Sequence, residues 1–156
     1  MTLNYKYFIL KQIFKKNNFK YFIIFLLLKL TFSFLTSIIA TYFDPTSTQN
    51  PIDKYDITAN IILSLIIAPL LETLLFQYAL IELLLKTKLS PLFIIAISSL
   101  LFGLSHNYNI SYIIATTISG FFYATYYYKL RNQGRLTGFL LITLLHSLSN
   151  LPSLFL

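Results

Sequence analysis

The stretch that decides the fold is residues 57–85, which read ITANIILSLIIAPLLETLLFQYALIELLL. It is longer than the about 20 apolar residues that a helix needs to cross a bilayer. Near its middle stands Glu72, three residues after Pro69. An ionisable group inside a bilayer is costly, so it usually faces the interior of a helix bundle and has a function. The stretch therefore predicts a membrane helix with a polar site on its protein-facing side.

The composition of the whole chain supports this interpretation. The 156 residues are 56% hydrophobic and only 11% charged, whereas ordinary soluble domains are about 25% charged. There is no cysteine, which excludes disulfides and thiolate chemistry. The net charge of +7 comes from basic residues that separate apolar runs, which favours a lipid bilayer as partner and not a nucleic acid. We expect residues 1–156 to form a single transmembrane domain.

Apolar runs and polar breaks predict an all-α polytopic transmembrane helix bundle with about five membrane helices. The approximate limits of these helices are 21–43, 57–85, 91–106, 110–128 and 136 to the C-terminus. Residues 1–20 form a basic arm, predicted to be an N-terminal amphipathic interfacial helix. Five spans with a cytoplasmic N-terminus place every basic cluster on one side, which indicates an integral protein of the cell (plasma) membrane.

Three further residues in the apolar runs have simpler expected roles. We expect Lys29 to extend its ammonium group to the membrane surface. Glu82 stands four residues before Lys86, which predicts a local ion pair on one helix face. Pro69 can bend or restart its helix, and a restart would bring Glu72 near a new helix N-terminus.

The only two histidines of the chain lie in two other apolar runs, at His106 and His146. A helix rises ~1.5 Å per residue, so counting from the basic loops places Glu72 roughly 21 Å, His106 roughly 22 Å and His146 roughly 16 Å into the bundle. Asn150 follows His146 by four residues and shares its helix face. The four side chains are therefore predicted to converge in one water-accessible pocket.

These residue types suggest hydrolysis. A buried carboxylate at Glu72 can take a proton from water, and His106 can polarise the same water or bind a metal. His146 and Asn150 can donate hydrogen bonds to a developing oxyanion. The alternative is structural: a carboxylate, two imidazoles and an amide that link helices through hydrogen bonds.

The order of these residues resembles a known family. Residues 68–77, APLLETLLFQ, resemble the first motif of the CPBP intramembrane proteases, the CAAX protease and bacteriocin-processing family, which reads Glu-Glu-x-x-x-Arg after a proline. Phe102 to His106 matches the second motif, Phe-x-x-x-His, and residues 119–126 resemble the glycine-containing helix that follows it. His146 to Asn150 matches the last motif, His-x-x-x-Asn. The core expected to correspond to the protease domain is 57–156.

The resemblance implies an all-helical membrane endopeptidase that acts on a peptide or protein at the membrane. It implies Glu72 as general base, His106 as its assistant, and His146 and Asn150 as oxyanion donors. The family is described both as metal-dependent and as metal-free, so zinc or another divalent metal held by Glu72, His106 and His146 stays an open alternative.

Two departures from the first motif bear on activity. Thr73 replaces the second glutamate and Gln77 replaces the arginine. Besides the endopeptidase, we therefore keep a non-catalytic membrane module, for bacteriocin self-immunity or as a scaffold. A proton-coupled transporter with Glu72 as relay is a third alternative, which five helices without an internal repeat disfavour.

Overall fold

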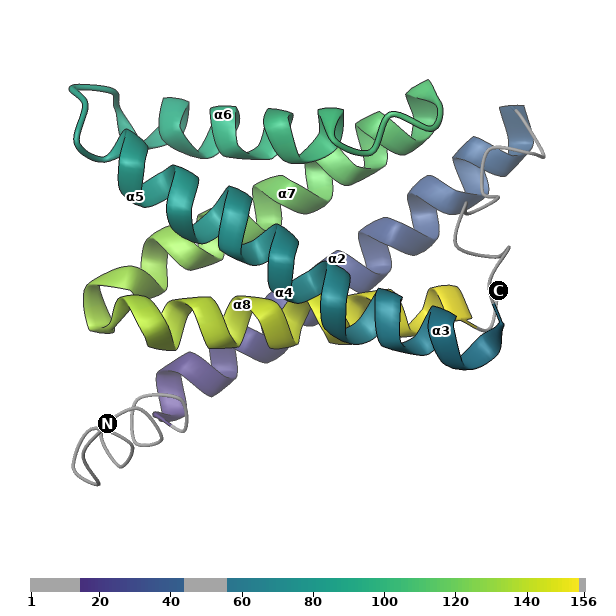
Figure 1. Ribbon diagram of the computed structural model, residues 1–156, viewed down its shortest axis with the longest axis horizontal. Coiled ribbons are helices and arrows are strands. Elements are labelled where there is room, and N and C mark those ends of the chain that lie inside the picture. Colours follow the sequence, from purple (N-terminus) through teal and green to yellow (C-terminus); the bar gives the residue numbers. More distant parts are fainter. Residues whose placement is uncertain (1–14, 44–55, 155–156) are drawn as a thin grey trace.

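The computed structural model describes residues 15–43 and 56–154, and within these ranges the chain forms helices and no strand (Figure 1). The all-α prediction is thereby confirmed for the described residues. Most of the predicted basic arm, residues 1–20, lies outside them.

The described part of the chain contains the helices expected from the apolar runs, in the expected order. The first is α2 (Lys16–Phe43), and the second is a composite helix over Ile57–Leu84. They are followed by α6 (Pro91–Leu104), α7 (Ile110–Leu130) and α8 (Arg135–Asn150), with the short 3₁₀ turns η4 (Arg131–Gln133) and η5 (Leu151–Leu154) after α7 and α8. The limits agree with the prediction to within a few residues, except at the start of α2 and the end of α8.

The composite helix changes its winding along its length. Its segments are α3 (Ile57–Ile62), η2 (Leu63–Ile67), α4 (Ala68–Glu72), η3 (Thr73–Leu80) and α5 (Ile81–Leu84), of which η2 and η3 are π-helical. Asp56 caps the start, where its Oδ1 accepts the backbone N–H groups of Thr58 at 2.9 Å and Ala59 at 3.0 Å.

Pro69 does not interrupt this helix. Ile67 and Ala68, the two residues before it, keep right-handed helical backbone angles, and π-helical segments lie on both sides of the short α4 segment. A π turn changes the hydrogen-bond register locally, which lets the helix continue past a residue without an N–H group. The possible restart at Pro69 is therefore not observed, and Glu72 lies inside a continuous helix.

Small residues bring α6 and α7 together. A Cβ atom built on Gly103 would lie 1.8 Å from Thr117 Oγ1 and 2.9 Å from the Ile113 carbonyl oxygen. One built on Gly120 would lie 3.1 Å from Ser99 Cα. Glycines at such contacts allow two membrane helices to approach closely, and this approach fixes the position of the C-terminal end of α6, where His106 follows.

The first helix, α2, packs across α7 and α8 (Figure 1). Phe25 stacks on Tyr126 with ring centroids 4.7 Å apart, and Phe32 lies against Phe122 at 6.0 Å. Lys29 stands between these two contacts, is only 5% exposed, and donates from Nζ to Ser33 Oγ at 2.5 Å. The expectation that Lys29 reaches the membrane surface is wrong, because the aromatic contacts on either side turn it into the bundle.

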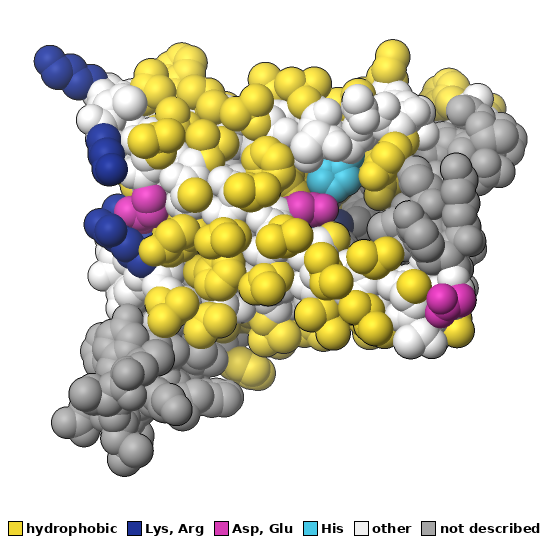
Figure 2. All heavy atoms as spheres, viewed as in Figure 1, with side chains coloured by type: hydrophobic (Ala, Val, Ile, Leu, Met, Phe, Trp, Pro, Cys, Tyr) yellow, Lys and Arg dark blue, Asp and Glu magenta, His cyan; other side chains and the backbone are white. Residues whose placement is uncertain are grey.

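The end of the molecule that holds the loops after α5 and α7 is charged. Figure 2 shows Lys and Arg side chains gathered at one edge of the visible face. Here Glu82 binds Arg131, Nε to Oε1 at 2.7 Å, and Arg135, Nε to Oε2 at 3.1 Å. The predicted Glu82–Lys86 pair is therefore wrong: the partners come from the beginning of α8 and the turn before it.

The face seen in Figure 2 is largely apolar, and many large hydrophobic side chains of the described residues are exposed. Two helices of the described part are long and apolar enough to cross a membrane, Asn17–Phe43 and Ile57–Leu84, and Pro91–Leu104 is a shorter apolar helix. That all five helices span a bilayer stays a prediction.

Candidate active site

Glu72 ends the α4 segment near the middle of the composite helix. Its side chain is 24% exposed, so the carboxylate is neither fully buried nor fully in solvent. Figure 2 shows an acidic and a histidine side chain side by side among apolar ones, near the middle of the visible face. The carboxylate is therefore partly shielded from solvent by its apolar neighbours.

His106 follows the end of α6, and its ring is held by the last turn of that helix. Nδ1 lies 2.8 Å from the carbonyl oxygen of Phe102. A carbonyl oxygen only accepts hydrogen bonds, so Nδ1 carries the proton. In the neutral ring, Nε2 is then an acceptor, and it faces Glu72 Oε2 at 3.6 Å.

His146 reaches the same carboxylate oxygen from α8. Its Nε2 lies 3.6 Å from Glu72 Oε2, and its side chain is 4% exposed. The ring stacks on Tyr123, with centroids 4.5 Å apart and planes inclined by 30°. Phe102 packs against both imidazoles, at 4.7 Å from His106 and 5.7 Å from His146.

A hydrogen-bond chain fixes Tyr123 beneath His146. Ser149 Oγ donates to the His146 carbonyl oxygen at 2.9 Å. Its proton is thereby used, so the Tyr123 hydroxyl donates to Ser149 Oγ at 2.5 Å. The position of Tyr123 in the bundle was not predicted from the sequence, because nothing in its spacing sets it apart from the neighbouring aromatic residues of α7.

The structure thus brings Glu72, His106 and His146 together, as the depth estimate predicted. Both nitrogen–oxygen gaps of 3.6 Å exceed a direct hydrogen bond. Gaps of this size between polar atoms are commonly bridged by water. One carboxylate oxygen and two imidazole nitrogens, partly open to the exterior, form an arrangement that can hold and deprotonate a water molecule.

The side chain of Asn150 binds to the backbone of the composite helix. Its Nδ2 donates to the Ser64 carbonyl oxygen at 3.1 Å, and Ser147 Oγ donates to that of Leu65. Both acceptors belong to the π-helical segment η2. Among the described residues Asn150 has no hydrogen bond to Glu72, His106 or His146. One of its two N–H groups therefore links α8 to the composite helix.

Thr73 and Gln77 lie on the interior side of η3. Both are 0% exposed. Thr73 Oγ1 and both polar atoms of the Gln77 side chain find no hydrogen-bond partner within the described part of the chain. Buried polar groups are rarely left without hydrogen-bond partners. The two positions that depart from the family motif are therefore also positions where buried polar atoms lack such partners.

A metal role for Glu72, His106 and His146 has mixed support. Two imidazoles and a carboxylate are a donor set that catalytic zinc uses. However, no group of three or more His, Cys, Asp or Glu side chains in residues 15–43 and 56–154 is arranged to hold a metal ion. The three side chains as placed do not fit a metal centre, and the metal role stays a prediction.

The fold and the site define the class of protein: a helical bundle in which Glu72, His106 and His146, the Glu72 trio, face one another from three helical segments. Comparison with known families places the chain more narrowly. The profile of the family described as type II CAAX prenyl endopeptidase Rce1-like matches residues 54–152, more than half of the chain. The chain belongs to this family, and with its apolar helices it is a membrane protein. No functionally curated protein and no solved structure gives a significant match.

Proposed function

We propose that the protein is an intramembrane endopeptidase that hydrolyses a peptide bond near the membrane with water activated by Glu72. The observation that carries the proposal is the convergence of both His Nε2 atoms on Glu72 Oε2 at 3.6 Å. Membership of an endopeptidase family supports the reaction class.

The surroundings of the two imidazoles favour opposite protonation. His106 carries its proton on Nδ1, towards the Phe102 carbonyl, so its Nε2 accepts. Nδ1 of His146 is buried with no partner among the described residues. An orphaned N–H group is rarer than an under-satisfied acceptor, so we assign the His146 proton to Nε2, where it faces the Glu72 carboxylate.

These protonation states give each side chain a separate task. A bound water donates one hydrogen to Glu72 Oε2 and the other to His106 Nε2, and Glu72 takes the proton as the oxygen attacks the peptide carbonyl. The Nε2–H of His146 donates to the resulting oxyanion. The second N–H of Asn150 is assigned to the same oxyanion. Collapse of the tetrahedral intermediate passes the proton from Glu72 to the leaving amine.

The test is cleavage of a farnesylated CAAX peptide by the purified protein in lipid vesicles, with the unprenylated peptide in parallel. Glu72→Gln is expected to lower kcat by at least about 100-fold, the lower range for loss of a general base. Glu82→Gln is the matched control, since Glu82 belongs to the same composite helix but binds Arg131 and Arg135. Equal activity in wild type and Glu72→Gln would refute the proposal. Loss of activity on addition of a chelator would show that the reaction depends on a bound metal ion.

One observation favours a second candidate, a non-catalytic membrane module for bacteriocin self-immunity or as a scaffold. Thr73 and Gln77 replace the charged pair of the family motif and are buried without partners in the described part. If this candidate is correct, wild type shows no cleavage, and Glu72→Gln and His146→Gln keep full biological activity in cells.

A further inference from the structure

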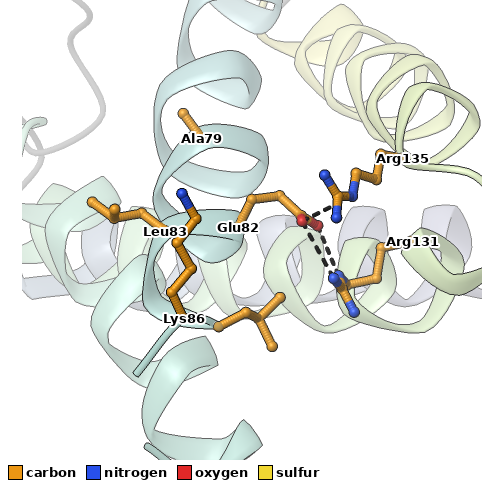
Figure 3. Close-up of a pocket in the computed structure, with 7 residues that line it drawn as sticks. Ala79, Glu82, Leu83, Lys86, Arg131 and Arg135 are labelled. Carbon is orange, nitrogen blue, oxygen red and sulfur yellow. Dashed lines mark hydrogen bonds and ion pairs between the residues drawn. The ribbon is translucent and has the colours of Figure 1, made fainter. Parts of the chain in front are cut away.

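A pocket of about 510 Å³ opens at the charged end of the bundle, away from the Glu72 site. Lys86, Arg131 and Arg135 supply its positive charges, and Glu82 is its acidic residue (Figure 3). Ala79 and Leu83 form part of its wall. Three cations and one carboxylate leave the pocket with two surplus positive charges.

Glu82 is already occupied by its neighbours. Arg131 holds it with two hydrogen bonds, Nε to Oε1 at 2.7 Å and Nη2 to Oε2 at 3.2 Å, and Tyr127 OH donates to Oε1 at 3.1 Å. The bond to Glu82 raises the pKa of the Arg131 guanidinium above its ordinary value, so Arg131 stays charged. Glu82 also contacts Arg135, Nε to Oε2 at 3.1 Å, so this single carboxylate is shared by two guanidinium groups and cannot neutralise all three cations of the pocket.

Two cations are left with donors for a ligand. The Arg135 side chain is 62% exposed although its Nε contacts Glu82. Lys86 is exposed and forms no ion pair with any residue that the structure describes. Both stand where the apolar helices give way to loops, at the level expected for the headgroups of a bilayer.

The apolar wall indicates what kind of anion fits. Ala79 and Leu83 are exposed and four residues apart, so they lie on one helix face, and Leu83 is 59% exposed. From Lys86 this face runs towards the middle of the composite helix. A cationic rim above an apolar helix face matches an amphiphile with an anionic head, and basic pockets between membrane helices bind such headgroups.

We propose that this pocket binds the phosphate of an anionic phospholipid, with an acyl chain lying along Ala79 and Leu83. Lys86 and Arg135 contact the phosphate, and Arg131 keeps Glu82 turned away from it. The site lies outside the Glu72 trio, so its occupancy is measured without reference to peptidase activity.

The experiment is native mass spectrometry of the delipidated full chain in detergent, titrated with phosphatidylglycerol or with phosphatidylcholine of the same acyl chains. Each basic residue near a membrane surface is worth about fivefold in affinity, so Lys86→Gln with Arg135→Gln is expected to weaken phosphatidylglycerol binding about 30-fold. Lys20→Gln with Lys88→Gln removes the same charge outside the pocket and is expected to leave binding unchanged. Lys86→Gln alone, which breaks no ion pair among the described residues, is expected to cost about fivefold.

Three results would overturn the proposal. One is equal binding of the two lipids by wild type. Another is equal weakening by the pocket pair and the control pair, which would assign the effect to general surface charge. The third is displacement of the lipid by glycerol phosphate at the same concentration, which would make the pocket a site for free phosphate.

Discussion

Replacing Gln77 by methionine should stabilise the protein. The Gln77 side chain is 0% exposed, and neither its amide nitrogen nor its amide oxygen has a partner in the described part of the chain. Methionine has nearly the same length and helix propensity and carries no strong donor or acceptor. Since an unpaired buried amide costs about 1–3 kcal/mol in proteins, the free energy of unfolding should rise by that amount.

The measurement is unfolding by sodium dodecyl sulfate in mixed micelles, followed by circular dichroism. Gln133→Met is the matched control, because Gln133 Oε1 accepts a hydrogen bond from Asn18 Nδ2 at 3.0 Å. Losing that bond should lower the free energy of unfolding by about 0.5–1.5 kcal/mol. If the change in the free energy of unfolding has opposite signs at the two glutamines, the effect comes from hydrogen bonding and not from methionine itself. Destabilisation by Gln77→Met would show that the Gln77 amide has a partner in the folded protein, and the reasoning would fail.

Three more results are expected. Nitrogen-15 NMR of histidine-labelled protein should show His106 protonated on Nδ1 and His146 on Nε2, with His106→Gln assigning the signals; the same tautomer in both would contradict the assigned roles. Gly103→Ala should destabilise the bundle by about 1–3 kcal/mol in the same unfolding assay, because its Cβ would overlap Thr117 and the Ile113 carbonyl. Lys29→Met should raise the free energy of unfolding by about 2–3 kcal/mol, since a buried ammonium whose hydrogen-bond partner within residues 15–43 and 56–154 is a serine hydroxyl is costly; lower stability would mean that Lys29 is paired with a charged group.

The positions and lengths of the helices were predictable, because each apolar run between polar breaks corresponds to one helix. What the pattern does not contain is the winding inside a helix. The composite helix continues through Pro69 with π-helical segments on both sides of it. From α8, Asn150 and Ser147 donate hydrogen bonds to carbonyl groups of one of these segments, η2. Those contacts join residues more than 80 positions apart, so no local rule reports them.

The same distinction separates the site predictions that succeeded from those that failed. Depth along a helix follows from a count of residues, which is why Glu72, His106 and His146 were expected at one level and are found together. Direction and partner do not follow from such a count. The spacing predicts a partner for Glu82 on its own helix, whereas the structure places Arg131, 49 residues away, at 2.7 Å from its carboxylate. The sequence predicts an outward-facing Lys29, because it does not show that α7 packs against this part of α2.

The first family motif divides into two faces, and this division bears on whether the site is active. Glu72 is partly exposed and faces the imidazoles, whereas Thr73 and Gln77 are 0% exposed and their side-chain polar atoms have no hydrogen-bond partner in the described part of the chain. We therefore expect substitutions at those two positions to change the buried side of the helix and to leave the partly exposed side with Glu72 in place. If so, Thr73→Val with Gln77→Met should raise the unfolding midpoint without changing cleavage, while Glu72→Gln should remove cleavage without changing the midpoint. A joint loss of activity and gain of stability in the Thr73 and Gln77 pair would show instead that the buried polar groups take part in holding the water.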